Sequence, residues 1–149
     1  MFWILMAAAV FVLDYCLKRQ VEEKPDDYRK EILGGRILLR KSHNRGAMMN
    51  LMDERQQLVA GFSLGLTVSL TAAWLYLLGR RGFGLMKTGL SLLIGGACSN
   101  VFDRLKRRYV VDYFSFQVKW KRMQKIVFNL GDICIFLGTF LLWNGQRKS

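Results

Sequence analysis

Residues 58–78 form an uninterrupted run of 21 amino acids without a charged side chain. A helix of that length measures roughly 30 Å, which matches the thickness of the hydrocarbon core of a bilayer. The rest of the chain alternates between apolar and charged blocks, so a hydrophobic content of 52% coexists with a net charge of +12. A soluble basic protein would interleave its charged and apolar residues. The sequence therefore predicts an integral membrane protein.

Three further apolar blocks cover residues 2–18, 85–102 and 126–143. Together with 58–78 they give four expected membrane spans, which would place both termini on the same side of the membrane. A chain of 149 residues is expected to form one domain. We therefore predict a single-domain, all-α membrane protein with four transmembrane helices.

The first long loop contains a strand-like pattern. Two apolar runs, Ile37–Leu39 and Met48–Met49, flank the polar residues Ser42–Gly46. This arrangement predicts two extended segments around a turn, so we expect a small β-hairpin over residues 34–51, between spans one and two. Because two strands alone are only marginally stable in water, the hairpin is expected to lean on the membrane surface or on another element.

Carboxylates and amides recur within or beside the apolar segments. At the end of the third span, Asp103 and Arg104 follow Asn100 at spacings of three and four, so on a helix the three residues share one face. Asn129 and Asp132 repeat the spacing of three on the fourth span. Because an isolated charge in apolar surroundings is costly, a carboxylate inside a membrane span indicates a functional site.

Asp112 and Asp132 allow two interpretations. Asp112 follows Arg107 and Arg108 closely and could simply neutralise them, whereas Asp132 is surrounded by apolar residues and lacks such partners. The position of Asp132 therefore favours a functional role for the carboxylates.

Asp14 and Lys18 stand four residues apart near the end of the first span, where a helix would bring them together. We favour a structural ion pair at the membrane surface, with Lys18 extending outward, over a functional polar site.

The chain has three cysteines, Cys16, Cys98 and Cys134, and one histidine, His43. The cysteines lie in apolar blocks without CxxC spacing, so we expect them to act as small packing residues. No cluster has the spacing of metal ligands, so we predict neither a metal site nor another cofactor.

Five motifs, in order along the chain, resemble those of the lipoprotein signal peptidase family, also called signal peptidase II. The matching segments are LDYCLK, NRGAMM, GGACSNVFDR, YVVDYF and FNLGD. The residues at the family's polar and glycine positions are Asp14, Lys18, Asn44, Gly46, Asn100, Asp103, Arg104, Asp112, Asn129 and Asp132. The chain departs from the family pattern at Met48, Met49, Ser99 and Gly131, which bears on rate and substrate preference more than on chemistry.

The resemblance implies a four-span aspartic peptidase of the bacterial cytoplasmic membrane, with Asp112 and Asp132 as its catalytic dyad. Asn100 and Asn129 would hydrogen-bond the dyad or the substrate, and Arg104 would pair with Asp103. The implied substrate is a prolipoprotein with a diacylglyceryl group on the cysteine just after the cleaved bond. The hairpin would clamp this substrate at the surface, with Asn44 reaching the modified cysteine.

The resemblance also implies that the hairpin and the active site lie near the outer face of the membrane, and we expect a monomer surrounded by phospholipid. The distribution of basic residues favours the opposite orientation in the membrane. Residues 18–57 and 103–125 carry 18 of the 23 lysines and arginines, which a positive-inside count would place in the cytoplasm. We give the five ordered motifs more weight than this charge bias.

Two other classes of protein compete with this interpretation. A small proton-coupled transporter could use Asp14 or Asp132, but it would not require the loop motifs in this order. A non-catalytic, lipid-binding relative would keep the fold and lose the dyad, and the presence of both aspartates argues against it. Nucleic-acid binding, which the net charge alone suggests, is less consistent with the apolar blocks than attraction to anionic lipid head groups.

Overall fold

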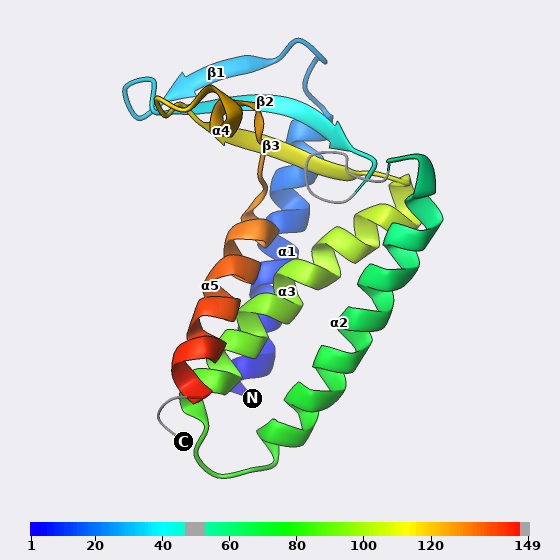
Figure 1. Ribbon diagram of the computed structural model, residues 1–149, viewed down its shortest axis with the longest axis vertical. Coiled ribbons are helices and arrows are strands. Elements are labelled where there is room, and N and C mark those ends of the chain that lie inside the picture. Colours follow the sequence, from blue (N-terminus) through cyan, green and yellow to red (C-terminus); the bar gives the residue numbers. More distant parts are fainter. Residues whose placement is uncertain (47–52, 147–149) are drawn as a thin grey trace.

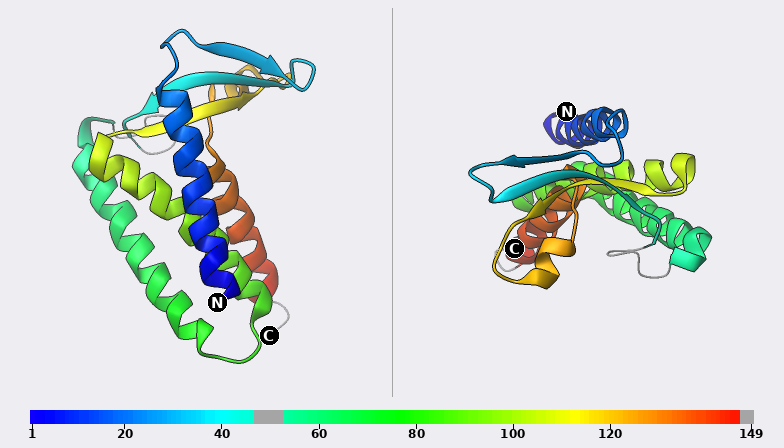
Figure 2. Two further views of the ribbon diagram at one scale, coloured as in Figure 1. Left: turned by 180° about the vertical axis from the view of Figure 1, so that it is seen from behind. Right: turned by 90° about the horizontal axis from the view of Figure 1, so that it is seen from above.

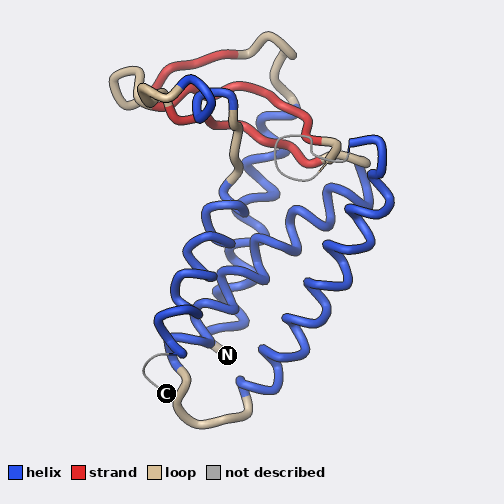
Figure 3. Tube along the Cα trace, viewed as in Figure 1, coloured by secondary structure: helices blue, strands red, loops and turns tan. Residues whose placement is uncertain are grey.

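The computed structural model describes residues 1–46 and 53–146, which form a helical bundle with a small sheet across one end (Figures 1 and 3). The long helices are α1 (Phe2–Glu22), α2 (Gln56–Leu78), α3 (Gly84–Arg107) and α5 (Leu130–Gln146). The strands are β1 (Arg29–Ile32), β2 (Ile37–Asn44) and β3 (Val110–Phe116), and the short helices are η2 (Asp53–Arg55) and α4 (Lys121–Lys125). The start of α1 and the end of α5 lie together at the end of the bundle opposite the sheet.

Each predicted span corresponds to one long helix, although α1, α3 and α5 run past the predicted ends of their spans. Helix α5 also begins at Leu130, four residues after the predicted start at residue 126. By length and composition, α2 and α3 are apolar enough to cross a membrane, whereas the apolar part of α5, Leu130–Gly145, is shorter. The helical architecture is thus confirmed, and a total of four membrane spans stays a prediction.

Helix α3 forms the centre of the bundle and packs against α1, α2 and α5. Glycines allow its close approach to α5: Gly96 lies against Gly131, and a Cβ atom on Gly138 would come within 2.5 Å of the carbonyl oxygen of Gly89. Small residues at such crossings let two backbones pack closely. Gly95 and Gly96 thus let α3 pack closely against α1 and α5.

Helix α2 is much less covered than α3. Within the most apolar 18-residue stretch of each helix, 17% of the stretch is buried in α2 and 61% in α3. The side chains of Phe62, Val68 and Leu75 on α2 are all more than half exposed. A helix that is apolar all round and largely uncovered is typical of a helix that faces lipid.

The sheet is antiparallel with strand order β1-β2-β3. The predicted turn at Ser42–Gly46 is wrong, because β2 continues through Asn44 and the hairpin turn lies instead at residues 33–36. Gly34 and Gly35 there have positive φ angles, which glycine adopts without strain. The predicted second extended segment, Met48–Met49, lies outside the described residues.

Strand β3 comes from the second long loop and was not predicted. It pairs with β2 so that Asp112 lies opposite Ser42. On its other edge, Phe128 exchanges backbone hydrogen bonds with Phe114, with the N–H of Phe128 donating over 2.7 Å. Seen from above, the sheet crosses the helix ends (Figure 2). The pairing of Phe128 with Phe114 fixes the start of α5 directly beside the strand that carries Asp112.

Candidate active site

The structure brings Asp112 of β3 and Asp132 of α5 to one polar cluster under the sheet. Asn129 precedes α5, and its side-chain oxygen accepts the N–H of Asp132 over 2.8 Å. In return, the Asp132 carboxylate accepts the N–H of Asn129 over 3.1 Å. This is a reciprocal helix cap, and it explains why the two residues stand three apart in the sequence. The cap fixes the backbone that carries Asp132.

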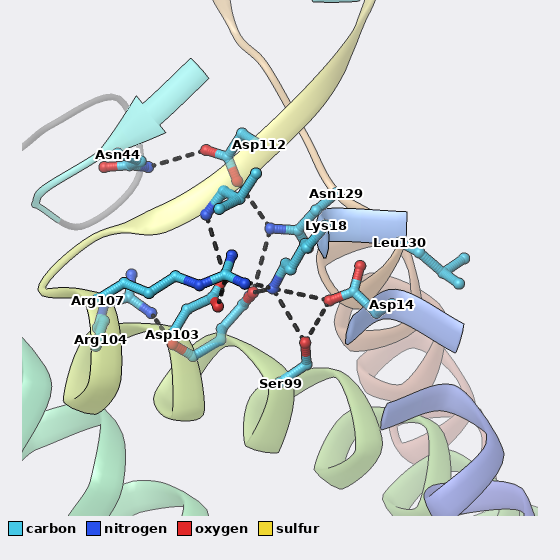
Figure 4. Close-up of polar contacts among 12 residues, drawn as sticks. Asp14, Lys18, Asn44, Ser99, Asp103, Arg104, Arg107, Asp112, Asn129 and Leu130 are labelled. Atoms are coloured by element: carbon cyan, nitrogen blue, oxygen red, sulfur yellow. Dashed lines mark hydrogen bonds and ion pairs between the residues drawn. The ribbon is translucent and has the colours of Figure 1, made fainter. Parts of the chain in front are cut away.

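Asn129 also connects the two carboxylates, and Figure 4 shows its contact with Asp112. Its Nδ2 donates to Asp112 Oδ1 over 2.7 Å and to Asn100 Oδ1 over 3.1 Å. Asn100 then donates from Nδ2 to Asp132 Oδ1 over 2.9 Å, and Asn44 donates to Asp112 Oδ2 over 3.3 Å. Each carboxylate therefore accepts two hydrogen bonds, and both belong to one network of amides.

Asp112 is 4% exposed, and burial is the main cause that raises the pKa of its carboxyl group to about 7. The nearby charge of Asp132 raises this pKa further, whereas hydrogen bonds from Asn129 and Asn44 oppose the rise. Asp112 forms no ion pair within the described part of the chain, and Arg107 pairs instead with Asp103. The interpretation of Asp112 as a neutralising partner of nearby arginines is not supported.

Lys18 is fully buried, so the expectation that it extends outward is wrong. Its Nζ lies 2.8 Å from Asp14 and 3.3 Å from Asp103, and it donates to Ser99 over 3.1 Å and to Asn100 over 2.7 Å. Three of these acceptors lie on α3, which packs against α1, so the ammonium group turns inward, where its charge is compensated. Asp14 and Lys18 thus form an internal ion pair rather than one at the surface.

The charge of Lys18 determines how the amides are oriented. An ammonium group can only donate hydrogen bonds, so the oxygen of Asn100 must face Lys18 and its NH₂ group must face Asp132. The same oxygen accepts from Asn129, which turns the NH₂ group of Asn129 towards Asp112. Lys18 therefore makes both amides present donors to the two carboxylates.

Arg104 does not pair with Asp103, contrary to the expectation. Its guanidinium group donates to the backbone oxygen of Gly46 over 3.3 Å, and thereby connects α3 to the segment after β2. The carboxylate of Asp103 accepts the N–H of Val111 over 3.2 Å and pairs with Lys18. Asp103 thus fixes the start of β3 to α3.

Two residues of the cluster were not identified as site residues from the sequence. Ser99, noted only as a departure from the family pattern, donates from its hydroxyl group to Asp14 over 2.6 Å. Tyr113 donates to Asp14 over 3.1 Å and accepts the N–H of Leu130 over 2.8 Å. Burial, followed by the charge of Asp14, raises the pKa of the Tyr113 hydroxyl group. The position of Tyr113 directly after Asp112 in a short apolar run was the only available signal.

Two cavities meet at this cluster. A small cavity of about 90 Å³ is lined by the polar residues Asn44, Asn100, Arg104, Asp112 and Asp132, together with four apolar residues. A larger apolar groove of about 870 Å³ runs between α2, α3 and α5, and it also reaches Asn100, Arg104 and Asp132. The carboxylates therefore lie where the small polar cavity adjoins the apolar groove.

Among residues 1–46 and 53–146, no group of three or more His, Cys, Asp or Glu side chains could hold a metal ion. The three cysteines are free: Cys134 is buried, Cys98 is partly buried and Cys16 is exposed. The expected packing role thus fits Cys134 best, and it does not describe Cys16.

The fold is that of known bacterial membrane enzymes. One solved structure, a bacterial membrane enzyme determined by the in meso method at 2.3 Å resolution, matches with a TM-score of 0.83. The match covers 99% of this chain and 88% of that chain at 21% identity. A second such enzyme, at 1.9 Å resolution, matches with a TM-score of 0.80 over 99% of this chain and 94% of that chain, also at 21% identity. At this level of identity the likeness establishes the fold.

Sequence comparisons identify the family. The family model of signal peptidase (SPase) II matches residues 6–145. Two relatives named lipoprotein signal peptidase, from Caldicellulosiruptor bescii and Moorella thermoacetica, are each 31% identical to this chain. The alignment with the first covers 95% of this chain and 87% of the relative, and with the second 94% and 89%. The chain belongs to the signal peptidase II family and is a protease of that class, which confirms the resemblance predicted by its five motifs.

Proposed function

We propose that this protein is an aspartic endopeptidase that removes the signal peptide from diacylglyceryl-modified prolipoproteins, at the bond before the modified cysteine. The observation that carries this proposal is the placement of Asp112 and Asp132 on one small cavity, joined through Asn129. Two neighbouring carboxylates that share one proton can hydrolyse a peptide bond without a metal or a covalent intermediate. The alternatives of a transporter and of a non-catalytic relative offer no comparable use for this pair.

The environments of the two carboxylates differ in a way that suggests their roles. Asp112, with its pKa raised to about 7, would hold the shared proton and donate it to the scissile carbonyl oxygen. Asp132 lies in the first turn of α5, where the helix dipole and the N–H of Asn129 offset part of the cost of burying its charge. It would take a proton from the attacking water. When the tetrahedral intermediate collapses, Asp132 would pass this proton to the leaving amine and Asp112 would regain one from the gem-diol, so the pair again holds a single shared proton.

Asn44 supplies a second feature that suits a peptide substrate. Its NH₂ group donates to Asp112, while its Oδ1 atom is buried and has no hydrogen-bond partner among the described residues. A buried acceptor without a partner is unfavourable unless a ligand satisfies it. We assign to this oxygen the N–H of a substrate residue next to the cleaved bond.

The apolar groove between α2, α3 and α5 would receive the hydrophobic part of the substrate. A signal helix or acyl chain in this groove would bring the scissile bond to Asp132 and Arg104, which lie on its wall. In this arrangement α1, α2, α3 and α5 cross the cytoplasmic membrane and the sheet lies at its outer face. The enzyme would act as a monomer in contact with membrane phospholipid.

The test is cleavage of a purified prolipoprotein by the purified protein in detergent or nanodiscs. The diacylglyceryl-modified form should be cut before its cysteine, and an unmodified form of the same precursor should be cut far more slowly. Activity should persist after exhaustive chelation of metals. Equal cleavage of both forms would contradict the proposed substrate, and a loss restored by zinc would contradict the aspartic mechanism.

A further inference from the structure

The hairpin turn and α4 together form one end of the sheet. Gln117, directly after β3, donates its backbone N–H to the carbonyl oxygen of Arg36 over 2.8 Å, and Phe116 pairs with Ile37. Figure 1 and the left view of Figure 2 show the hairpin turn and α4 at the end of the sheet that projects past α5. We call residues 29–36 and 117–125 the overhang.

The overhang is strongly basic. Three lysines or arginines lie in residues 29–36 and four in residues 117–125, against a single acid, Glu31. All seven basic side chains are exposed, and none of them forms an ion pair with a carboxylate of the described residues. Such a group of like charges repels itself, so the surface is suited to a partner that brings negative charge.

Arg40 holds part of this surface in a fixed position. Its Nη2 atom donates to the carbonyl oxygens of Gln124 and Lys125 over 3.2 Å and 3.0 Å, which satisfies the C-terminal end of α4. The basic side chains of α4 are therefore carried by an element that is fastened to β2 rather than by a free loop.

The same surface exposes large apolar side chains. Trp120 is 76% exposed and Leu33 is 69% exposed. Leu33 also has a φ angle of 52°, in the left-handed region that favours glycine, so it combines an exposed side chain with a strained backbone. Tryptophan is enriched at the interface between membrane and water, and lysines and arginines beside it attract anionic head groups.

We propose that the overhang is a docking surface for anionic phospholipids of the leaflet beneath it. Lipid phosphodiester groups would pair with its lysines and arginines, and Trp120 and Leu33 would enter the head-group layer. The inference depends on the membrane placement given under the proposed function, but not on the cleavage reaction. It also explains why the long loops are basic: a folded element holds these residues against lipid, so they do not follow the rule for short, unfolded loops.

The fluorescence of Trp120 provides the test. The full chain is reconstituted in nanodiscs of phosphatidylcholine alone or with phosphatidylglycerol, and the spectrum of Trp120→Phe is subtracted from that of the wild type. The side chain of Trp120 is exposed, so this substitution leaves the core intact. Phosphatidylglycerol should shift the difference emission to shorter wavelength and reduce its quenching by acrylamide by about twofold, and high salt should reverse both effects.

Two double variants control for charge. Lys121→Gln/Arg122→Gln should abolish the response to phosphatidylglycerol. Arg80→Gln/Arg81→Gln, which removes two basic residues at the opposite end of the molecule, should keep it. Identical emission in both lipid mixtures, or an equal loss in both double variants, would overturn the proposal. Because the readout does not involve proteolysis, it stays valid even if the protein cuts no prolipoprotein.

Discussion

At the scale of single residues, Lys18 accounts for the geometry around the carboxylates. Its charge orients Asn100 and, through it, Asn129, so that both amides present donors to the acids. The sequence predicted that these polar residues meet, because they resemble ordered family motifs. It did not predict the inward turn of Lys18, since that depends on acceptors on α3, 81 to 85 residues further along the chain. The spacing of residues along α1 shows which of its side chains share a face, but it does not show which residues of α3 pack against that face.

The raised pKa of Asp112 predicts how the free energy of unfolding depends on pH. The ordinary value for aspartic acid is 3.8, and the folded protein raises that of Asp112 to about 7. The folded state therefore binds this proton more tightly than the unfolded chain, and the wild type loses stability as the pH rises from about 4 to about 7. Asp112→Asn cannot ionise. Its free energy of unfolding relative to the wild type should therefore rise over this range, by on the order of a few kcal/mol, and then stay level.

Unfolding of both proteins in detergent, followed between pH 4 and pH 8.5, measures this difference. If the difference between Asp112→Asn and the wild type is the same at all pH values, Asp112 does not hold a proton in the folded protein at neutral pH.

At the scale of elements, the helices were largely predicted, whereas only the hairpin of the sheet was, with its turn misplaced and β3 missed. Long apolar runs bounded by charged residues define helices from composition alone, whereas β3 is a short run, VVDYF, whose partner β2 lies some 70 residues earlier. The hairpin turn was misplaced because Ser42–Gly46 has the composition of a turn. The Gly34–Gly35 pair that forms the actual turn carries an equally strong local signal. Pairing with Asp112 and Val111 of β3 keeps Ser42 and His43 extended.

The crossing of α3 and α5 gives a matched pair of glycine variants. A Cβ atom on Gly96 would overlap the backbone of Gly131, directly before Asp132, whereas a Cβ atom on Gly65 of α2 would meet nothing within 4 Å. Gly96→Ala should lower the free energy of unfolding by about 1–3 kcal/mol and reduce cleavage, because it pushes the start of α5 away from β3. Gly65→Ala should be neutral or slightly stabilising.

Thermal unfolding and cleavage by the two alanine variants, measured side by side, check this account of the crossing. Equal behaviour of Gly96→Ala and Gly65→Ala would mean that α3 and α5 do not pack through their glycines.

At the scale of the whole molecule, the sheet end carries Asp112, Asp132 and most of the basic residues, whereas the start of α1, the end of α5 and the α2–α3 turn lie at the other end. Composition predicted a membrane protein with one domain, and the family resemblance predicted the orientation. Charge counting alone favours the opposite orientation, because it does not distinguish a folded basic surface from an unfolded loop.

Cysteine labelling resolves the orientation. In a chain whose three native cysteines are replaced by alanine, Asp27→Cys lies in the exposed loop before β1, and Arg81→Cys lies in the exposed α2–α3 turn. In intact cells a membrane-impermeant thiol reagent should label Asp27→Cys, and it should label Arg81→Cys only after lysis. The reverse pattern would place the active site in the cytoplasm.

The central claim is that Asp112 and Asp132 act together on a peptide bond. The most direct measurement is the rate at which Asp112→Asn, Asp132→Asn and the double variant cleave a diacylglyceryl-modified prolipoprotein, with each variant first shown to be folded in detergent. Each single variant should lose roughly 10²–10⁴-fold or more in rate, and the double variant should be no slower than either one, because the two carboxylates work as a unit. Near-normal cleavage by either single variant would remove that residue from the dyad and contradict this account.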